Sequence, residues 1–226
     1  MDILSIVVSL FVLLFAITIH EASHGWSALR MGDPTAYAAG RVTLNPIAHI
    51  DPLGTVILPV ILVILGAPAF GWAKPVPVNP YNLRHPRRDN LWIALAGPAA
   101  NMTAAAAALV SLRILRVLRP GVTEFLQSFV LLRQPFPRGF FPLEGLALIL
   151  FYGVLINTYL AVFNLIPVPP LDGSGILSGL LSDSAAAAYD RIRPYGFVIV
   201  MLLVYAGLLS IIIRPILNVI GRIIFF

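Results

Sequence analysis

The chain has 226 residues, of which 59% are hydrophobic and only 11% are charged. A soluble globular domain is about 45–50% apolar and about 25% charged, so this composition excludes an ordinary soluble protein and predicts a membrane protein. The net charge of +5 comes from basic residues spread over the connecting segments. That distribution favours contact with the lipid bilayer and its anionic headgroups, and it offers no basic, aromatic-rich surface for nucleic acid.

The first apolar segment, residues 3–30, predicts a membrane-spanning helix that ends at a Gly-Asp-Pro turn signal. After it, residues 41–44 alternate polar with apolar side chains, which predicts a short membrane-associated β hairpin. Residues 52–73 carry no charge, but prolines and glycines leave an apolar centre of only residues 56–65. The segment 35–73 therefore contains, besides the hairpin, either a re-entrant segment or a true crossing, and the pattern favours neither.

Three further apolar segments predict helices at residues 91–112, 145–166 and 195–213. Small side chains in the first of these helices allow close contact with a neighbouring helix. A Pro-Val-Pro-Pro run ends the second helix and opens the backbone just before Asp172. Residues 1–226 are thus interpreted as one domain, an all-α polytopic membrane protein with about 4–5 transmembrane helices.

Residues 20–24 read His-Glu-Ala-Ser-His and lie within the first predicted helix. Histidines four residues apart lie on one face of a helix, close enough to share one ion. The chain has no cysteine, so a third ligand must be His, Asp, Glu or a backbone oxygen. Of the ten acidic residues, only Glu21 and Asp172 lie at the edges of long apolar helices. We therefore predict one Zn²⁺ per chain, bound by His20, His24 and Asp172, with Glu21 activating a water molecule.

Three blocks together resemble the site-2 protease family of intramembrane zinc metalloproteases. They are residues 20–24, a Gly-Pro-Ala-Ala-Asn block at residues 97–101, and residues 164–173. Their order and spacing match as well, and the resemblance covers most of the chain. It implies that the two histidines and Asp172 are zinc ligands, and that the glutamate of the first block is the general base. It also implies a minimal form of the family, without a PDZ or CBS domain.

Two asparagines also match the family: Asn164 matches an asparagine near its active site, and Asn101 matches the end of its small-residue motif. The resemblance implies that Asn101 and Asn164 orient substrate or stabilise charge, and hydrogen bonding between helices is the alternative role for both. The residues His49, Asp51 and His85 have the spacing of loop residues rather than of a shared helical face. We predict structural roles for these three rather than a second metal site.

The resemblance implies an intramembrane zinc metalloendopeptidase of regulated intramembrane proteolysis. Its substrates would be transmembrane segments of single-span membrane proteins, or remnant peptides, and an unwound substrate could add as a strand to residues 41–44. The chain length and the lack of a transit segment favour a multi-pass protein of the prokaryotic plasma membrane, and a homo-oligomer stays open. A membrane zinc transporter is the alternative function, because intramembrane His and acidic side chains also line ion pathways.

Overall fold

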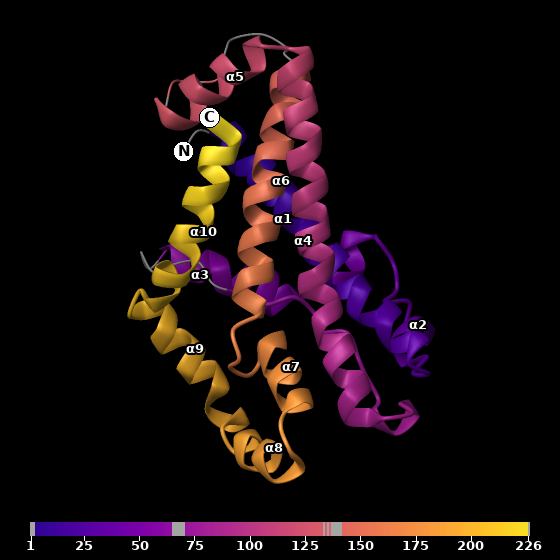
Figure 1. Ribbon diagram of the computed structural model, residues 1–226. Coiled ribbons are helices and arrows are strands. Elements are labelled where there is room, and N and C mark those ends of the chain that lie inside the picture. The colour runs from indigo at the N-terminus through magenta and orange to yellow at the C-terminus, as the bar shows by residue number, and fades with distance from the viewer. Residues whose placement is uncertain (1–2, 65–70, 133, 135, 137–141, 226) are drawn as a thin grey trace.

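The computed structural model describes residues 3–64, 71–132, 134, 136 and 142–225 (Figure 1). Over these residues the prediction of an all-α fold is confirmed. Three of the described helices are long and apolar enough to cross a membrane: α1 (Ile3–Arg30), α4 (Pro86–Leu118) and α6 (Pro142–Asn164). At about 1.5 Å per residue, each is longer than the roughly 30 Å of a hydrocarbon core.

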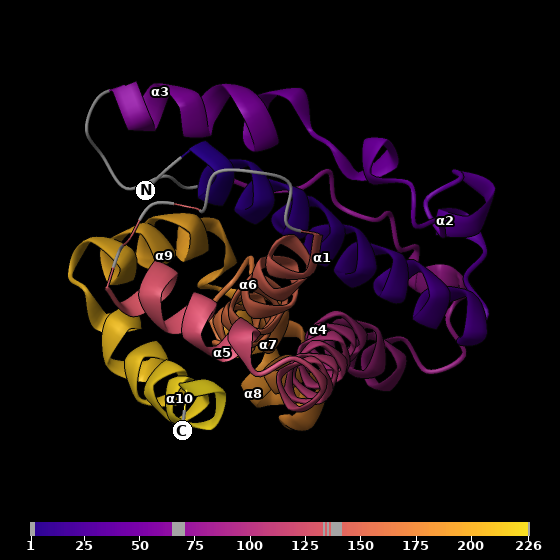
Figure 2. The ribbon, with the colours of Figure 1, turned by 90° about the horizontal axis from the view of Figure 1, so that it is seen from above.

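These three helices pack against one another. Helix α4 contacts both α1 and α6, and α1 also contacts α6. Seen from above in Figure 2, α4 and α6 appear end-on while α1 crosses them at an angle. Small side chains permit this close approach: a Cβ atom added at Gly153 of α6 would lie only 3.2 Å from the Cβ of Ala108 on α4.

The predicted β hairpin is wrong, because the described part of the chain contains no strand. The segment after α1 instead forms the short helix α2 (Thr35–Ala38) and, after a bend, a 3₁₀ turn (Pro46–His49). In the bend, His49 Nε2 donates a hydrogen bond to the carbonyl oxygen of Thr43, 2.9 Å away. The Thr43 carbonyl oxygen thus accepts a hydrogen bond from a nearby side chain, where a β ladder would need it to accept from a neighbouring strand. The idea that substrate adds to a strand at residues 41–44 loses its basis.

Residues 52–73 begin with a π-helical turn (Pro52–Ile57) that continues into α3 (Leu58–Ile64). These two described elements together are about 20 Å long, compared with the roughly 30 Å of a hydrocarbon core. Figure 2 shows α3 lying across the axes of α4 and α6 rather than along them. Residues 65–70 lie outside the described residues.

The two ends of this segment lie next to each other. The backbone N–H of Trp72 donates to the carbonyl oxygen of Gly54 at 3.2 Å, and Thr55 Oγ1 donates to the carbonyl oxygen of Trp72 at 2.9 Å. Two residues further on, the N–H of Lys74 donates to the carbonyl oxygen of His49 at 3.0 Å. Residues 49–55 and 72–74 therefore lie side by side.

Asp33 fastens the end of α1 to the connector that precedes α4. Its buried carboxylate accepts hydrogen bonds from Asn82 Nδ2 at 2.8 Å, from the N–H of Asn79 at 2.7 Å, and from the N–H and hydroxyl of Thr35. Burial opposes ionisation of this carboxyl, but the hydrogen bonds outweigh it and hold the pKa of Asp33 below its usual value. The position of the last turn of α1 is thereby fixed.

Four shorter helices follow α6; in Figure 1 the first two lie below the three long helices, and the last two return along their side. These are α7 (Asp172–Leu180), α8 (Asp183–Asp190), α9 (Gly196–Tyr205) and α10 (Leu208–Phe225), while α5 (Gly121–Leu126) and a π-helical turn (Gln127–Leu131) follow α4 at the other end. The segment predicted as one helix at 195–213 is divided at Gly207, whose φ of 70° is left-handed and ends α9. Residues 195–213 therefore do not form one long helix, and three of the described helices qualify as spans, against the four or five that were predicted.

Candidate metal centre

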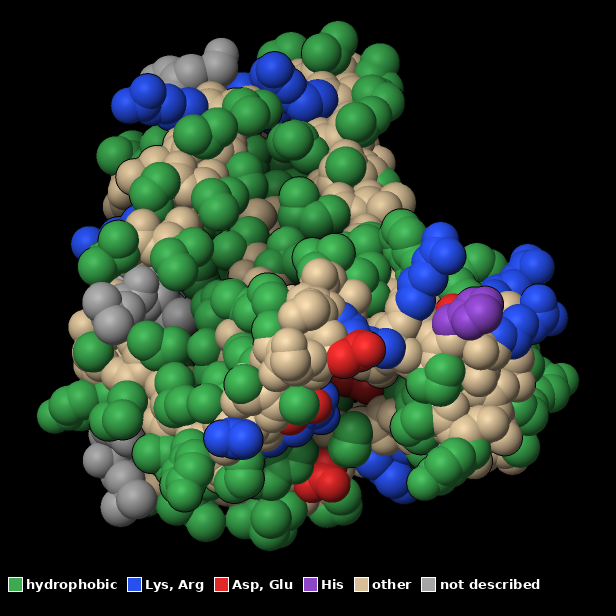
Figure 3. All heavy atoms as spheres, turned by 60° about the horizontal axis from the view of Figure 1, so that its bottom comes forward, with side chains coloured by type: hydrophobic (Ala, Val, Ile, Leu, Met, Phe, Trp, Pro, Cys, Tyr) green, Lys and Arg blue, Asp and Glu red, His purple; other side chains and the backbone are tan. Residues whose placement is uncertain are grey.

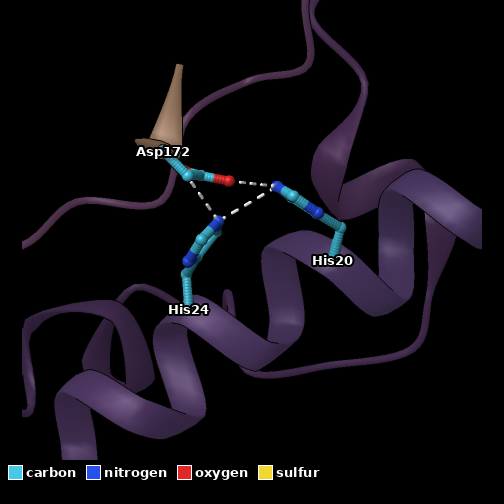
Figure 4. A group of neighbouring side chains, drawn as sticks. All are labelled: His20, His24 and Asp172. Atoms are coloured by element: carbon cyan, nitrogen blue, oxygen red, sulfur yellow. Dashed lines mark hydrogen bonds and ion pairs between the residues drawn. The ribbon is translucent and has the colours of Figure 1, made fainter. Parts of the chain in front are cut away.

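The structure brings His20, His24 and Asp172 together, although Asp172 is far from the histidines in sequence (Figure 4). The two histidines lie one turn apart on α1, and Asp172 is the first residue of α7. His20 Nε2 lies 3.0 Å from Asp172 Oδ2, and His24 Nε2 lies 3.3 Å from Asp172 Oδ1. The two Nε2 atoms are 3.1 Å apart, and both histidines are buried. Among the described residues, these three form the only cluster suited to a metal ion.

The hydrogen bonds behind the rings decide which nitrogen faces the cluster. His24 Nδ1 lies 2.7 Å from the carbonyl oxygen of Ile93 on α4. A carbonyl oxygen can only accept, so Nδ1 carries the hydrogen, and in the neutral ring Nε2 is left with its lone pair. The ring of His24 is thus held in the form that binds metal through Nε2.

His20 is held in the same way by Asn101 of α4. His20 Nδ1 lies 2.6 Å from Asn101 Oδ1, while Asn101 Nδ2 donates to the carbonyl oxygen of Ala16 at 3.0 Å. The second bond orients the amide, because its nitrogen must face the carbonyl and its oxygen must then face His20. His20 Nδ1 therefore donates, and its Nε2 also presents a lone pair to the cluster.

Two nitrogen lone pairs and a carboxylate thus converge on one point. Asp172 Oδ2 is buried and receives no hydrogen bond from the described residues. Such groups repel one another unless a cation lies between them. Two imidazole nitrogens and one carboxylate oxygen are a donor set of catalytic zinc sites, in which a fourth position stays open for water. The residues present therefore fit a zinc ion.

Two glycines let the backbone approach this cluster closely. A Cβ atom added at Gly97 of α4 would lie 2.5 Å from His24 Nε2 and 2.7 Å from His20 Cε1. A Cβ atom added at Gly173, directly after the aspartate, would overlap the carbonyl oxygens at the end of α6. Side chains at either position would displace the ligands, so both glycines are required by the packing of the site.

Helix α7 is fixed on α4 so that Asp172 faces α1. Glycines on α7 permit this contact: a Cβ atom at Gly175 would lie 2.9 Å from the Cβ of Ala94. At the far end of α7, Arg87 Nε donates to the carbonyl oxygen of Ser178 at 3.0 Å. Arg87 also pairs with Asp183 beside a cavity of about 450 Å³, and Figure 3 shows acidic and basic side chains gathered around a hollow on this face.

The remaining predicted residues take different places. Glu21 follows His20 on α1 and is half-buried. Asn101 is fully buried against His20 of the candidate metal cluster. Asn164 is not joined to the cluster: its Nδ2 donates to the carbonyl oxygen of Leu160, one turn earlier in α6, at 3.0 Å.

His49, Asp51 and His85, for which structural roles were predicted, are not part of a metal-binding cluster within the described residues. His49 donates to a carbonyl oxygen, Asp51 accepts the N–H of Gly54 at 2.7 Å, and His85 is exposed. One buried polar residue near the site was not predicted from the sequence. Asn157, buried in α6, bonds to Asn101, and its position seven residues before another asparagine in an apolar helix was the available signal.

Comparison with known proteins now adds to the geometry. The profile of peptidase family M50 matches residues 8–207. The chain belongs to peptidase family M50. It is therefore a zinc metalloprotease of a membrane protease family, and the resemblance to site-2 proteases is confirmed.

Two curated relatives of the M50 chain match most of its length. YwhC of Bacillus subtilis, a candidate zinc metalloprotease, is 32% identical over 206 residues, which are 91% of this chain and 84% of the relative. Rip2 of Mycolicibacterium smegmatis, also a candidate zinc metalloprotease, is 31% identical over 198 residues, which are 87% of this chain and 66% of the relative. No solved structure matches the chain.

Proposed function

We propose that this M50 protein hydrolyses peptide bonds within transmembrane segments of single-span membrane proteins or remnant peptides, in the prokaryotic plasma membrane. One observation carries the proposal: both Nε2 lone pairs, from the candidate span α1, converge with the Asp172 carboxylate at the start of α7. His20 lies about 26 Å along α1 from its first residue, at about 1.5 Å per residue. Ionisable groups on a membrane-spanning helix are costly to insert, which supports a catalytic reason for their presence.

His20, His24 and Asp172 are the residues that would hold zinc. When bound, zinc would act as a Lewis acid that polarises a carbonyl group and lowers the pKa of water towards about 7. Glu21 adjoins His20 on α1 and is half-buried, open enough to meet water. Its carboxylate takes the proton of the attacking water and passes it to the leaving amine.

The packed helices also shield the metal-binding side chains. His20 and His24 are 7% and 9% exposed, so the packed helices keep most water away from the reacting atoms. A helical substrate hides its carbonyl groups in its own hydrogen bonds and must unwind before it is attacked. The described residues hold one cluster of three candidate ligands, which supports a protease over a zinc transporter, for which we expect ligands spread along several helices.

The test compares zinc content and cleavage of a model single-span substrate for purified wild type, Glu21→Gln and Asp172→Ala. We expect both variants to lose cleavage, Glu21→Gln to keep zinc, and Asp172→Ala to bind it weakly. Glu144→Gln, at the start of α6 and away from the cluster, is the matched control and should cleave like the wild type. Zinc flux into proteoliposomes that survives Glu21→Gln, with no cleavage by the wild type, would overturn the proposal.

A further inference from the structure

Asn157 occupies the interior of the apolar helix α6 and is only 5% exposed. Its Oδ1 accepts a hydrogen bond from Asn101 Nδ2 at 2.8 Å, and its own Nδ2 donates to the carbonyl oxygen of Gly153 at 2.8 Å. Asn101 in turn accepts from His20 Nδ1 at 2.6 Å. A continuous chain of hydrogen bonds thus runs from α6 through α4 to a histidine of the metal cluster on α1.

The direction of every bond in this hydrogen-bonded network is fixed by two backbone carbonyls, those of Gly153 and Ala16. The Gly153 carbonyl can only accept, so the amide nitrogen of Asn157 faces it and Oδ1 faces Asn101. Asn101 must then turn its nitrogen to Asn157 and its oxygen to His20. The Ala16 carbonyl holds the other hydrogen of the same Asn101 nitrogen, so both hydrogens are used and the amide oxygen stays with the ring.

The orientation of the Asn101 amide determines the tautomer of His20. Helix packing alone would not depend on that orientation. If the Asn101 amide turned over, its nitrogen would face His20 Nδ1, which would then accept. The ring hydrogen would move to Nε2, the atom that faces Asp172 3.0 Å away. That tautomer cannot bind a metal through Nε2. A bond that merely joined two helices would serve equally well in either direction.

We propose that Asn157 is a positioning residue of the metal centre: through Asn101 it holds His20 in the tautomer that presents the Nε2 lone pair. The inference rests on the zinc site of the proposed function. Asn157 touches neither substrate nor metal in this arrangement. Its effect is carried by the orientation of one amide.

The test uses two substitutions that differ in what they keep. Asn157→Leu has a similar size but no acceptor, so one hydrogen of Asn101 loses its partner. Asn157→Asp, neutral in this apolar helix, keeps an oxygen for Asn101 and a hydroxyl for the Gly153 carbonyl. The control is Thr158→Val, which removes a polar group from the next position, where the side chain is 2% exposed.

Two readouts are taken on the full chain in detergent. Zinc affinity is measured by competition with a chelator, and the His20 tautomer is measured by nitrogen NMR on zinc-free protein. We expect Asn157→Leu to bind zinc about 10–100-fold more weakly and to lose the single Nδ1–H tautomer. We expect Asn157→Asp and Thr158→Val to resemble the wild type in both readouts.

Three outcomes would overturn the inference. One is wild-type zinc affinity in Asn157→Leu, and another is an equal loss in Thr158→Val, which would indicate packing rather than orientation. The third needs no variant: His20 of the zinc-free wild type carrying its hydrogen on Nε2. A wild type that binds zinc but does not cleave substrate would refute the proposed function and leave these readouts intact.

Discussion

Gly97 offers the sharpest test of the geometry of the site. Its position on α4 faces the imidazoles, and an added Cβ atom would lie 2.5 Å from His24 Nε2, 2.6 Å from His24 Cε1 and 2.7 Å from His20 Cε1. Ordinary van der Waals contact begins at 3.4 Å, so Gly97→Ala requires a shift of about 0.9 Å, the difference between 3.4 and 2.5 Å. That shift must come from the rings or from α4.

Neither can move freely. The rings of His20 and His24 are held through their Nδ1 atoms at 2.6 and 2.7 Å, and α4 supplies both of the groups that hold them. Overpacking of this kind costs about 1–3 kcal/mol, and a misplacement of about 1 Å costs about 100-fold in rate. We expect Gly97→Ala to bind zinc about 10–100-fold more weakly and to cleave a model single-span substrate about 100-fold more slowly.

The assay is a zinc titration against a chelator, run beside the cleavage assay. Gly145→Ala is the matched control, because the same methyl group on α6 would meet nothing within 4 Å. It should keep zinc affinity and activity, and stabilise the helix by up to about 1 kcal/mol. Wild-type zinc affinity and rate in Gly97→Ala would refute the close packing of α4 on the histidines.

Three further predictions concern other parts of the chain. Gly173→Ala should reduce bound zinc, measured by elemental analysis, because its Cβ atom would lie 2.5 Å from the carbonyl oxygen of Ile166 and push the neighbouring ligand away. The pKa of Asp33 is held below its usual 3.8 in the folded protein, so its stabilisation is complete above that pH and is lost as the pH falls through the lower folded value. The difference in melting temperature between wild type and Asp33→Asn should therefore shrink as the pH falls from neutral to about 3. A constant difference would contradict this. Gly207→Ala should lower the free energy of unfolding by about 1–2 kcal/mol, because φ there is 70°; Gly221→Ala, with open space around it, should not.

Much of the site could be predicted from short-range patterns. Composition alone indicates a membrane protein, since so many apolar side chains need a lipid environment. The helical period places His20 and His24 on one face of α1 whatever surrounds them. The prolines before Asp172 open the backbone at that residue, because they cannot continue a helix. These conclusions follow from backbone geometry within a few residues.

Two predictions from the sequence pattern differ from the structure. The alternation at residues 41–44 resembles a strand, but no described segment pairs with it, and side-chain hydrogen bonds within the bend take its place. The last apolar stretch looks continuous in sequence, yet Gly207 adopts a left-handed φ and divides it. The sequence pattern left both outcomes open, since strand pairing depends on neighbours distant along the chain and a glycine adopts either sign of φ.

The sequence by itself determined the class of protein, the histidine pair and the candidate third ligand. Only the tertiary structure decided what holds those ligands in place. His20 and Asn101 are 81 residues apart, and Asn101 and Asn157 are 56 apart. Such pairs form only where small residues let α1, α4 and α6 approach closely, and periodicity along one helix carries no information about the face of another.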